Sequence, residues 1–260
     1  MGYSAHRKIT VKERILLSML KGSSDTTSII GDMDDVVGTT ILHEIKQLLQ
    51  NHFIAKSTDG GYSLTSLGLF EAQLCERYNL ASATMETFRD FWLHHDVAAI
   101  PPELMVNIGA LSDAKIIHAT PVDLDSVHSH FIELLSSAKT IMGASPVFHP
   151  DYVLAFSELL NNGVKIQLIV TPEILAKIKQ VGSDSLKKHL PSGDLQLYVK
   201  DEIRVALTVT DKGFSLGLFD LLGRYDQTSD LIGEDEKGIT WATLLFRSVL
   251  LQSTPCESCL

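Results

Sequence analysis

Long apolar runs and cysteines are both scarce in this sequence of 260 residues. No uninterrupted apolar run approaches the ~20 residues that a bilayer crossing needs, and the first residues lack the apolar core of a signal peptide. We therefore expect a cytoplasmic protein with no membrane partner. Three cysteines are too few for a disulfide framework, and the pair Cys256 and Cys259 supplies at most half of a zinc site. Residues 253–260 are predicted to form a tail with two free thiols.

The signatures of common catalytic sites are also missing. The chain contains no glycine-rich phosphate loop, no Gly-x-Ser-x-Gly elbow and no zinc-protease motif. Its ten histidines include no pair spaced four residues apart, and His128 and His130 face different ways on a predicted helix. We therefore expect no catalytic residues, no metal and no cofactor, although His149 beside Asp151 leaves an enzyme of unknown chemistry as an alternative.

Charge is distributed unevenly along the chain. The net charge is −10, yet residues 1–62 hold equal numbers of basic and acidic side chains, so the whole excess of acid belongs to the rest. Nucleic-acid binding depends on where the cations lie more than on their sum. This asymmetry favours a small N-terminal part that approaches nucleic acid and a larger acidic part that stays away from it.

The order of the first predicted elements is that of a winged helix-turn-helix. The box Thr10-x-x-Glu13 begins a helix, Gly22 ends it, and Thr65 caps the last helix of the series. The predicted elements are helices over 11–22, 27–33 and 38–51, strands over 53–57 and 61–64, and a fourth helix after residue 65. Residues 1–80 are therefore predicted to form a DNA-binding domain.

The third predicted helix combines an apolar face with a polar one. Ile41, Ile45 and Leu48 recur at helical spacing, while threonine, histidine, lysine and glutamine occupy the other face. A helix fits the major groove of double-stranded DNA, and a hairpin wing reaches the phosphate backbone. The predicted DNA-binding residues are Thr39, Thr40, His43, Lys46, Gln47 and Lys56. In the alternative interpretation, these side chains only solvate the protein surface.

From about residue 126 the sequence alternates between helical and strand patterns, which predicts an α/β domain over 126–252 with one main sheet covered by helices. The expected helices cover 127–137, 150–161, 172–190 and 241–251, and the expected strands cover 140–144, 164–170, 195–199, 205–210 and 213–219, the last three spaced for hairpins. Residues 81–125, with a helix over 85–92, are expected to form a helical linker and dimerisation region. Phe88, Phe91 and Trp92 are candidates for the seam of a homodimer or, equally, for a core.

Polar residues follow several of the predicted strands. Ligands of open α/β sheets bind beyond the carboxyl ends of the strands, so these side chains are expected to line a pocket for a small-molecule effector. The predicted effector-binding residues are His95, Asp96, Ser145, His149, Thr171, Tyr225 and Asp226. Alternatively, those that precede Pro150 and Pro172 cap the helices that begin there.

Four stretches carry a resemblance to a known family: Gly61-Tyr62-Ser63-Leu64-Thr65, Phe91-Trp92-Leu93, Val147-Phe148-His149-Pro150 and Val209-Thr210-Asp211-Lys212-Gly213. Together they are similar to the methanogenesis-regulator (filamentation-regulator) family of archaeal winged helix-turn-helix transcription factors. The resemblance implies a regulator that binds double-stranded DNA, and it names no effector. The larger domain also resembles the phospholipase-D-like fold, although it lacks the His-x-Lys motif of the active enzymes. A non-catalytic protein-interaction module is the alternative function.

Overall fold

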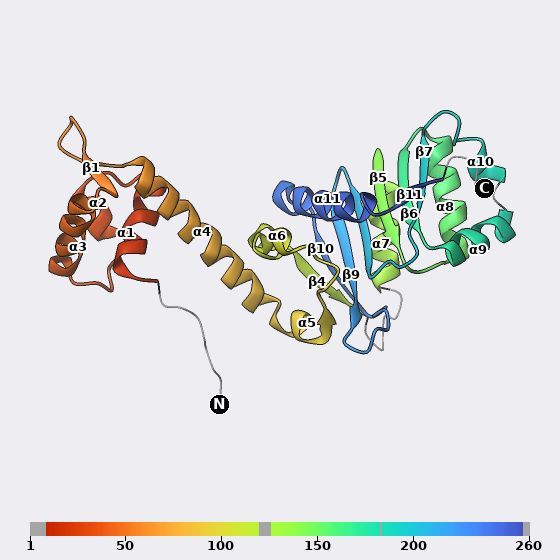
Figure 1. The fold of residues 1–260 in the computed structure, drawn as a ribbon, viewed down its shortest axis with the longest axis horizontal. Coiled ribbons are helices and arrows are strands. Elements are labelled where there is room, and N and C mark those ends of the chain that lie inside the picture. Colours follow the sequence, from red (N-terminus) through yellow and green to blue (C-terminus); the bar gives the residue numbers. More distant parts are fainter. Residues whose placement is uncertain (1–8, 120–125, 183, 257–260) are drawn as a thin grey trace. The chain divides into compact units, whose positions relative to one another are not determined.

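The computed structural model describes residues 9–119, 126–182 and 184–256. The chain divides into two compact units, residues 1–83 and 84–260 (Figure 1). Within the described residues, none of the helices has both the length and the apolar character that crossing a membrane requires.

The first unit begins with three helices and a two-stranded hairpin. Its elements are α1 (Val11–Leu20), α2 (Thr26–Gly31), α3 (Gly38–Gln50), β1 (Ile54–Lys56), β2 (Tyr62–Leu64) and α4 (Ser66–Thr87), the last of which extends past residue 83. The order is the predicted one. The predicted capping box at Thr10 and Glu13 is confirmed, with both reciprocal hydrogen bonds present.

Burial of one face of each helix holds this unit together. Ile15, Ile41, Ile45 and Leu48 are almost completely buried in a single core. The hairpin is tied through its backbone to the loop between α1 and α2, since the amide of Tyr62 donates to the carbonyl oxygen of Ser24 at 2.6 Å. The polar side of α3 is therefore left at the surface.

The second unit is built around a mixed sheet. Its helices are α5 (Arg89–His94), α6 (Pro102–Met105), the 3₁₀ turn η1 (Ile108–Leu111), α7 (Ser126–Ser136), α8 (Pro150–Asn161), α9 (Pro172–Gly182), α10 (Asp184–Lys187) and α11 (Glu236–Leu250). Its strands are β3 (His95–Asp96), β4 (Lys115–His118), β5 (Thr140–Ser145), β6 (Lys165–Val170), β7 (Leu195–Val199), β8 (Val205–Thr210), β9 (Phe214–Asp220), β10 (Ser229–Gly233) and β11 (Thr254–Pro255).

Parallel and antiparallel strands occupy different parts of this sheet. The strand order is β11-β7-β6-β5-β8-β9-β10-β4, and β3 pairs with β9. The neighbours β5 and β6, and β6 and β7, run parallel, whereas every other pair is antiparallel. The predicted α/β character is confirmed.

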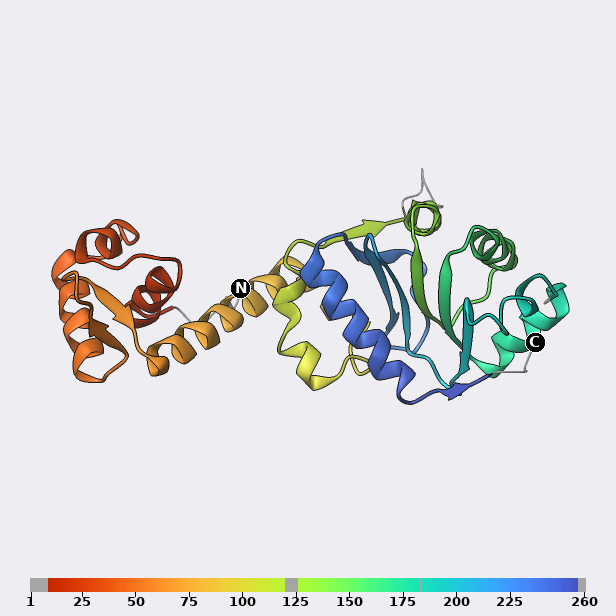
Figure 2. The same ribbon diagram turned by 90° about the horizontal axis from the view of Figure 1, so that it is seen from above.

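Helices cover both faces of the sheet (Figure 2). On one face, α11 brings Trp241, Leu245 and Phe246 into a core with apolar residues of β8 and β9. On the other face, α7, α8 and α9 pack over β5 and β6 around a second core that includes Val153 and Ile166. Alternation along each strand sends neighbouring residues into opposite cores, which is the expected period of two.

The expected hairpin between residues 195–199 and 205–210 is wrong. β7 pairs in parallel with β6, while β8 pairs with β5 and β9, so β5 and β6 separate the two strands. Spacing along the chain cannot distinguish a short hairpin connection from one that crosses to another position in the sheet. The strands β3, β4, β10 and β11 were not predicted at all.

The segment expected to be a helical linker contributes to the second unit instead. Its predicted helix over 85–92 is interrupted, because α4 ends at Thr87 and α5 begins at Arg89. Phe88 and Phe91 are buried in the core under α11, with Trp92 packed against them, so the core alternative describes these aromatics.

Two further predictions about helices and thiols need correction. The helix expected over 172–190 is divided into α9 and α10, and the last helix begins at Glu236 rather than at residue 241. In the tail, Cys256 is part of a disulfide, so the prediction of two free thiols is wrong. Cys259 lies outside the described residues.

Candidate functional site

The outward side of α3 carries most of the residues that the sequence predicts to contact DNA. Thr39, Thr40, His43 and Lys46 are exposed, Lys56 is exposed on β1, and Gln47 is half-buried. Their exposure follows from the packing of α3, since Ile41, Ile45 and Leu48 point into the core. The polar groups of this surface are therefore accessible to a large partner.

The cations of the first unit differ in whether an acid neutralises them. Lys12 lies 2.9 Å from Glu71, and Arg14 donates to both carboxylate oxygens of Asp35 at 2.6 and 2.9 Å. In the described part of the chain, no carboxylate forms an ion pair with Lys46 or Lys56. The charges of these two lysines remain available to an external anion.

A cavity of about 360 Å³ lies in the second unit, walled by the sheet and by helices α7 to α10. Helices contribute aromatic and aliphatic side chains, and the strands contribute small, polar and aliphatic ones. The lining includes His128 and Phe131 of α7, Tyr152 and Phe156 of α8, Gly143 and Ser145 of β5, Thr208 of β8, Ser215 of β9 and Asp230 of β10, with Phe148, His149, Tyr225 and Gln227 from loops. It is large enough for a small organic ligand.

One carboxylate belongs to this lining. Asp230 is 7% exposed, and its Oδ2 accepts a hydrogen bond from the hydroxyl of Ser215 at 2.5 Å. Its Oδ1 is buried and has no hydrogen-bond partner within the described structure. A Cβ placed on Gly217 would lie 2.6 Å from this Oδ1 and 2.7 Å from the hydroxyl of Tyr225, so glycine leaves room for both groups.

Burial perturbs the acids at this end of the cavity. It raises the pKa of Asp230 above its ordinary value, and the hydrogen bond from Ser215 only partly opposes this effect. It also raises the pKa of the Tyr225 and Tyr152 hydroxyls, with a further contribution from the nearby charge of Asp230. Perturbed groups of this kind concentrate at functional sites more often than elsewhere.

Four aromatic rings of the helical wall touch one another. The ring centroids of His128 and His149 are 5.3 Å apart, and Tyr152 stacks on His128 at 5.7 Å and lies 4.8 Å from Phe131. The hydroxyl of Tyr152 is also 3.4 Å from Nδ1 of His128. These contacts give the cavity a polarisable wall opposite the strands.

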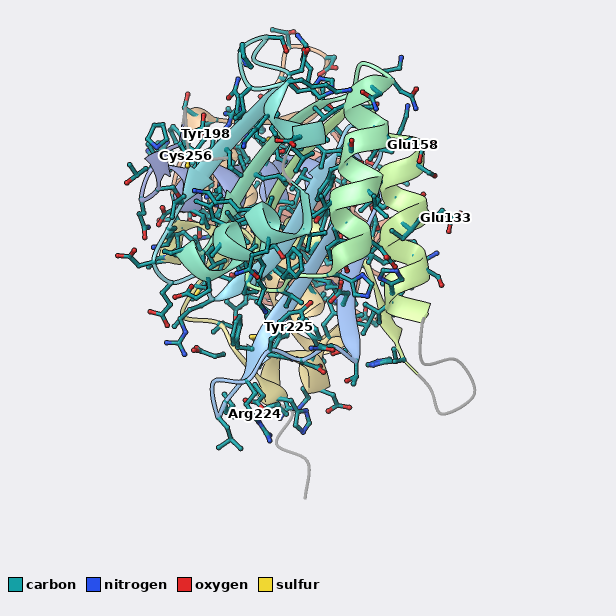
Figure 3. The ribbon with its side chains drawn as sticks, turned by 90° about the vertical axis from the view of Figure 1, so that its right-hand side faces the viewer. Glu133, Glu158, Tyr198, Arg224, Tyr225 and Cys256 are labelled. Atoms are coloured by element: carbon teal, nitrogen blue, oxygen red, sulfur yellow. The ribbon has the colours of Figure 1, made fainter. Side chains whose placement is uncertain are left out.

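A second cavity, of about 350 Å³, lies beside the first. Tyr225 lines both, together with His95, Arg224 and Asp226 in the second. Figure 3 shows Arg224 and Tyr225 in the segment that follows β9. The carboxylate of Asp226 accepts hydrogen bonds from Thr228, Ser229 and His95. Burial raises the pKa of Asp226, but these hydrogen bonds outweigh that effect and leave the pKa below its ordinary value.

The predicted effector-binding residues fall into separate groups. The main cavity includes Ser145, His149 and Tyr225, and the second includes His95 and Asp226 along with Tyr225. Asp96 instead lies 3.2 Å from Arg204, and the Thr171 hydroxyl accepts from the amide of Ile174 near the start of α9. His149 also caps α8, where its ring accepts from the amide of Asp151.

The sequence interpretation missed the polar residues on the strands themselves. Asp230, Ser215 and Thr208 lie on β8 to β10 rather than beyond strand ends. A signal for them exists in the pattern of two along the strands: Ser215 lies between the buried Phe214 and Leu216, and Asp230 precedes the buried Leu231. No three described His, Cys, Asp or Glu side chains converge into a metal-ligand set.

Comparisons with known proteins identify relatives for both units. The family described as methanogenesis regulatory protein FilR1, N-terminal domain, matches residues 7–78, and the FilR1 middle domain matches residues 124–252. The chain is 28% identical over 225 residues to methanogenesis regulatory protein FilR1 of Methanothrix harundinacea strain 6Ac. The alignment covers 84% of this chain and 50% of that protein. The chain thus spans about half the length of this curated relative.

Two solved structures show weaker likenesses. TrmBL2, described as an archaeal chromatin protein with a novel mode of DNA binding, is 13% identical, with 95% of each chain covered and a TM-score of 0.46. Phosphatidylserine synthase of Haemophilus influenzae Rd KW20 is 12% identical, with 86% of this chain and 48% of the synthase covered and a TM-score of 0.43. Both scores are below 0.5, and neither likeness supports a functional conclusion.

Proposed function

Because this chain belongs to the FilR1 family of methanogenesis regulatory proteins, we propose that it is a transcription regulator whose first unit binds double-stranded DNA as a winged helix-turn-helix. In this proposal α3 enters the major groove, where Thr39, Thr40 and His43 meet base edges. The hairpin of β1 and β2 is the wing. Lys46, Lys56 and Gln47 contact the backbone or neighbouring bases.

The observation that carries this proposal is the exposed polar side of α3 with its unneutralised cation. Lys46 lies on that side, and in the described residues no acid offsets it, whereas Lys12 and Arg14 are already ion-paired. A phosphate contact gains most from a cation that needs no prior ion pair to be broken. The acidic second unit favours an orientation in which the first unit meets the DNA.

Fluorescence anisotropy tests this proposal directly. The full chain is titrated against a labelled duplex from upstream of its own gene, and against a scrambled duplex, at 50 and 200 mM salt. We expect tighter binding to the upstream duplex and an affinity that falls steeply with salt. No salt-sensitive binding to either duplex would overturn the proposal and favour a protein-interaction module.

We further propose that the regulator is a homodimer through α4. Leu67, Phe70, Leu74 and Tyr78 are between 45% and 67% exposed on this helix and follow one another at intervals of three or four residues. An exposed apolar seam with this spacing is typical of paired helices. A second copy of α4 is the occupant that satisfies it symmetrically, and a two-fold protein reads palindromic operators.

The main cavity of the second unit is proposed as the effector site. Its volume, its aromatic wall and its few buried polar groups are the features of small-molecule pockets. Ser145, His149 and Tyr225 contribute to it. Asp226, which follows Tyr225 in the sequence, is hydrogen-bonded to His95 in the segment after α4. We propose no catalytic role for these groups. The phospholipase-D-like relationship of the sheet stays a prediction.

A further inference from the structure

The main cavity contains one carboxylate oxygen that lacks a partner. Asp230 is more than nine-tenths buried, Ser215 satisfies its Oδ2, and its Oδ1 has no partner among the described groups. Leaving such an oxygen unsatisfied destabilises a folded chain unless a ligand completes the site. Asp230 and Tyr225 both line the cavity, and Oδ1 and the hydroxyl of Tyr225 lie 2.6 and 2.7 Å from where a Cβ on Gly217 would be.

The rest of the lining determines which ligand charge is acceptable. No lysine or arginine belongs to the described lining of this cavity. Lys177 lies outside the lining, with its Nζ 5.8 Å from the centre of the Phe148 ring. The charge of Asp226 adds to the negative potential at Asp230, and His130 and His95 oppose it. An anionic ligand would therefore be buried against a carboxylate, in a described lining that offers no lysine or arginine to pair with it.

The aromatic rings of the cavity favour a ligand with positive charge. Phe131, Tyr152 and Phe156 stand along the helical wall, with Phe148 and His149 beside them. The faces of such rings attract cations, and the attraction is stronger where water is excluded. The cavity thus combines a buried hydrogen-bond acceptor at one end with an aromatic, largely apolar wall.

We propose that the effector is a small organic amine, bound with its primary ammonium group on Asp230 Oδ1 and its apolar body against the aromatic wall. This inference rests on the proposed effector role of the cavity and names the chemical class of the ligand. A primary ammonium donates the hydrogen bond that Oδ1 lacks and neutralises the carboxylate at the same time. A quaternary ammonium supplies the charge without the donor, and an alcohol supplies the donor without the charge.

A metal ion satisfies the carboxylate less well. A divalent cation prefers several oxygen or nitrogen ligands at fixed distances. Asp230 is the one carboxylate of the lining, and the described residues offer no cluster of three potential ligands. The apolar surroundings suit a cation that carries its own hydrocarbon.

Isothermal titration calorimetry with three matched probes tests the proposal on the unaltered chain. The probes are 2-phenylethylamine, its neutral counterpart 2-phenylethanol and its anionic counterpart 3-phenylpropionate, followed by propylamine and hexylamine to vary the apolar body. We expect measurable binding of the aromatic amine, at least tenfold weaker binding of the alcohol and none of the carboxylate. If no amine binds, or if the alcohol or the carboxylate binds as well as the amine, the proposal is wrong.

A pair of variants locates the ammonium. Asp230→Asn keeps the shape of the side chain and removes its charge, and we expect it to weaken amine binding by roughly thirtyfold or more. Glu158→Gln, an exposed change on α8 that is labelled in Figure 3, is the matched control and should leave the affinity unchanged. Thermal unfolding checks that each variant is folded. An equal loss of amine affinity in both variants would contradict the placement of the ammonium group on Asp230.

The outcome is separable from that of the DNA-binding proposal. The same preparation is titrated with duplex DNA in the absence of amine. If the chain binds DNA but no amine, the proposed ligand class is wrong and the DNA-binding proposal stands. If it binds the amine but no DNA, the DNA-binding proposal is wrong and the ligand class stands.

Discussion

His95 and Asp226 are separated by 131 positions in the sequence, yet Nε2 of the histidine lies 3.1 Å from Oδ2 of the aspartate. Nδ1 of the same ring lies 2.7 Å from the carbonyl oxygen of Phe91, so both ring nitrogens face oxygens that accept. The pair ties β3, directly after α5, to the segment that carries Tyr225.

Asp226→Asn should destabilise the second unit at neutral pH by about 2 kcal/mol, because it weakens charge-assisted hydrogen bonds from His95, Thr228 and Ser229. Folding lowers the pKa of Asp226, so its stabilising contribution is present above the unfolded value near 4 and is lost as the pH falls through the folded value. Urea unfolding should therefore show a difference in the free energy of unfolding between the parent chain and the variant that is smaller at pH 3 than at pH 7. The exposed Asp201→Asn serves as control, and an equal effect there would refute the explanation.

Asp230→Asn should instead stabilise the protein without ligand at neutral pH. Burial raises the pKa of Asp230, so this group favours the folded state only at low pH, and that advantage disappears as the pH rises through the raised value. A neutral amide avoids the cost of the buried charge. We expect the melting temperature to rise by about 2–4 °C at pH 7, for a gain of about 1 kcal/mol, and the gain to vanish near pH 4. A lower melting temperature at pH 7 would show that the carboxylate is satisfied after all.

Local signals were sufficient to predict the first unit. The capping box at Thr10, the apolar spacing of α3 and the glycines of the hairpin each act over a few residues, and the elements form where these signals lie. The second unit depends on pairing between distant strands. β10 contains only two apolar residues besides its glycine, Leu231 and Ile232, and its place between β9 and β4 follows from tertiary packing that short-range patterns do not record.

The candidate site was predictable only in part. Ser145 and Tyr225 were reached by the rule that ligands bind beyond strand ends, and both line the main cavity. Asp230 was not, because the rule says nothing about a carboxylate inside a strand. Its importance follows from burial and from the absence of a partner for Oδ1 among the described groups, and both are properties of the folded chain alone.

Gly68→Ala should unfold or strongly destabilise the first unit. A Cβ at this position would lie 1.9 Å from the carbonyl oxygen of Phe53, so the hairpin and the start of α4 could not keep their present contact. We expect a loss of at least 3 kcal/mol, which is at the upper end for single substitutions. Gly31→Ala is the matched control, since no atom lies within 4 Å of its Cβ, and it should stabilise α2 by about 0.5–1 kcal/mol. Comparable melting temperatures for both variants would contradict the steric argument.

Phe70→Glu should convert the proposed dimer into a monomer. The side chain is 67% exposed on α4, so the substitution leaves the fold of one chain intact and places a charge in the apolar seam. Light scattering coupled to size-exclusion chromatography should show a halved mass. Leu154→Glu, at an equally exposed position on α8, is the control and should keep the mass of the parent. A dimer that persists in the Phe70 variant would exclude α4 as its seam.

Lys46 and Lys56 give the most quantitative test of the DNA-binding surface. If Lys46 and Lys56 each contact a phosphate, replacing either by alanine releases about one fewer counterion on binding, and the slope of log affinity against log salt falls by about 1. The affinity should drop for the upstream and the scrambled duplex alike, because phosphate contacts carry no sequence information. Thr40→Ala should act differently, since it leaves the salt slope unchanged and reduces the preference for the upstream duplex. Lys237→Ala on α11 removes an exposed cation from the second unit and should change neither quantity. A slope that stays the same in both lysine variants would mean that α3 and the hairpin do not face the phosphate backbone, whatever else the chain binds.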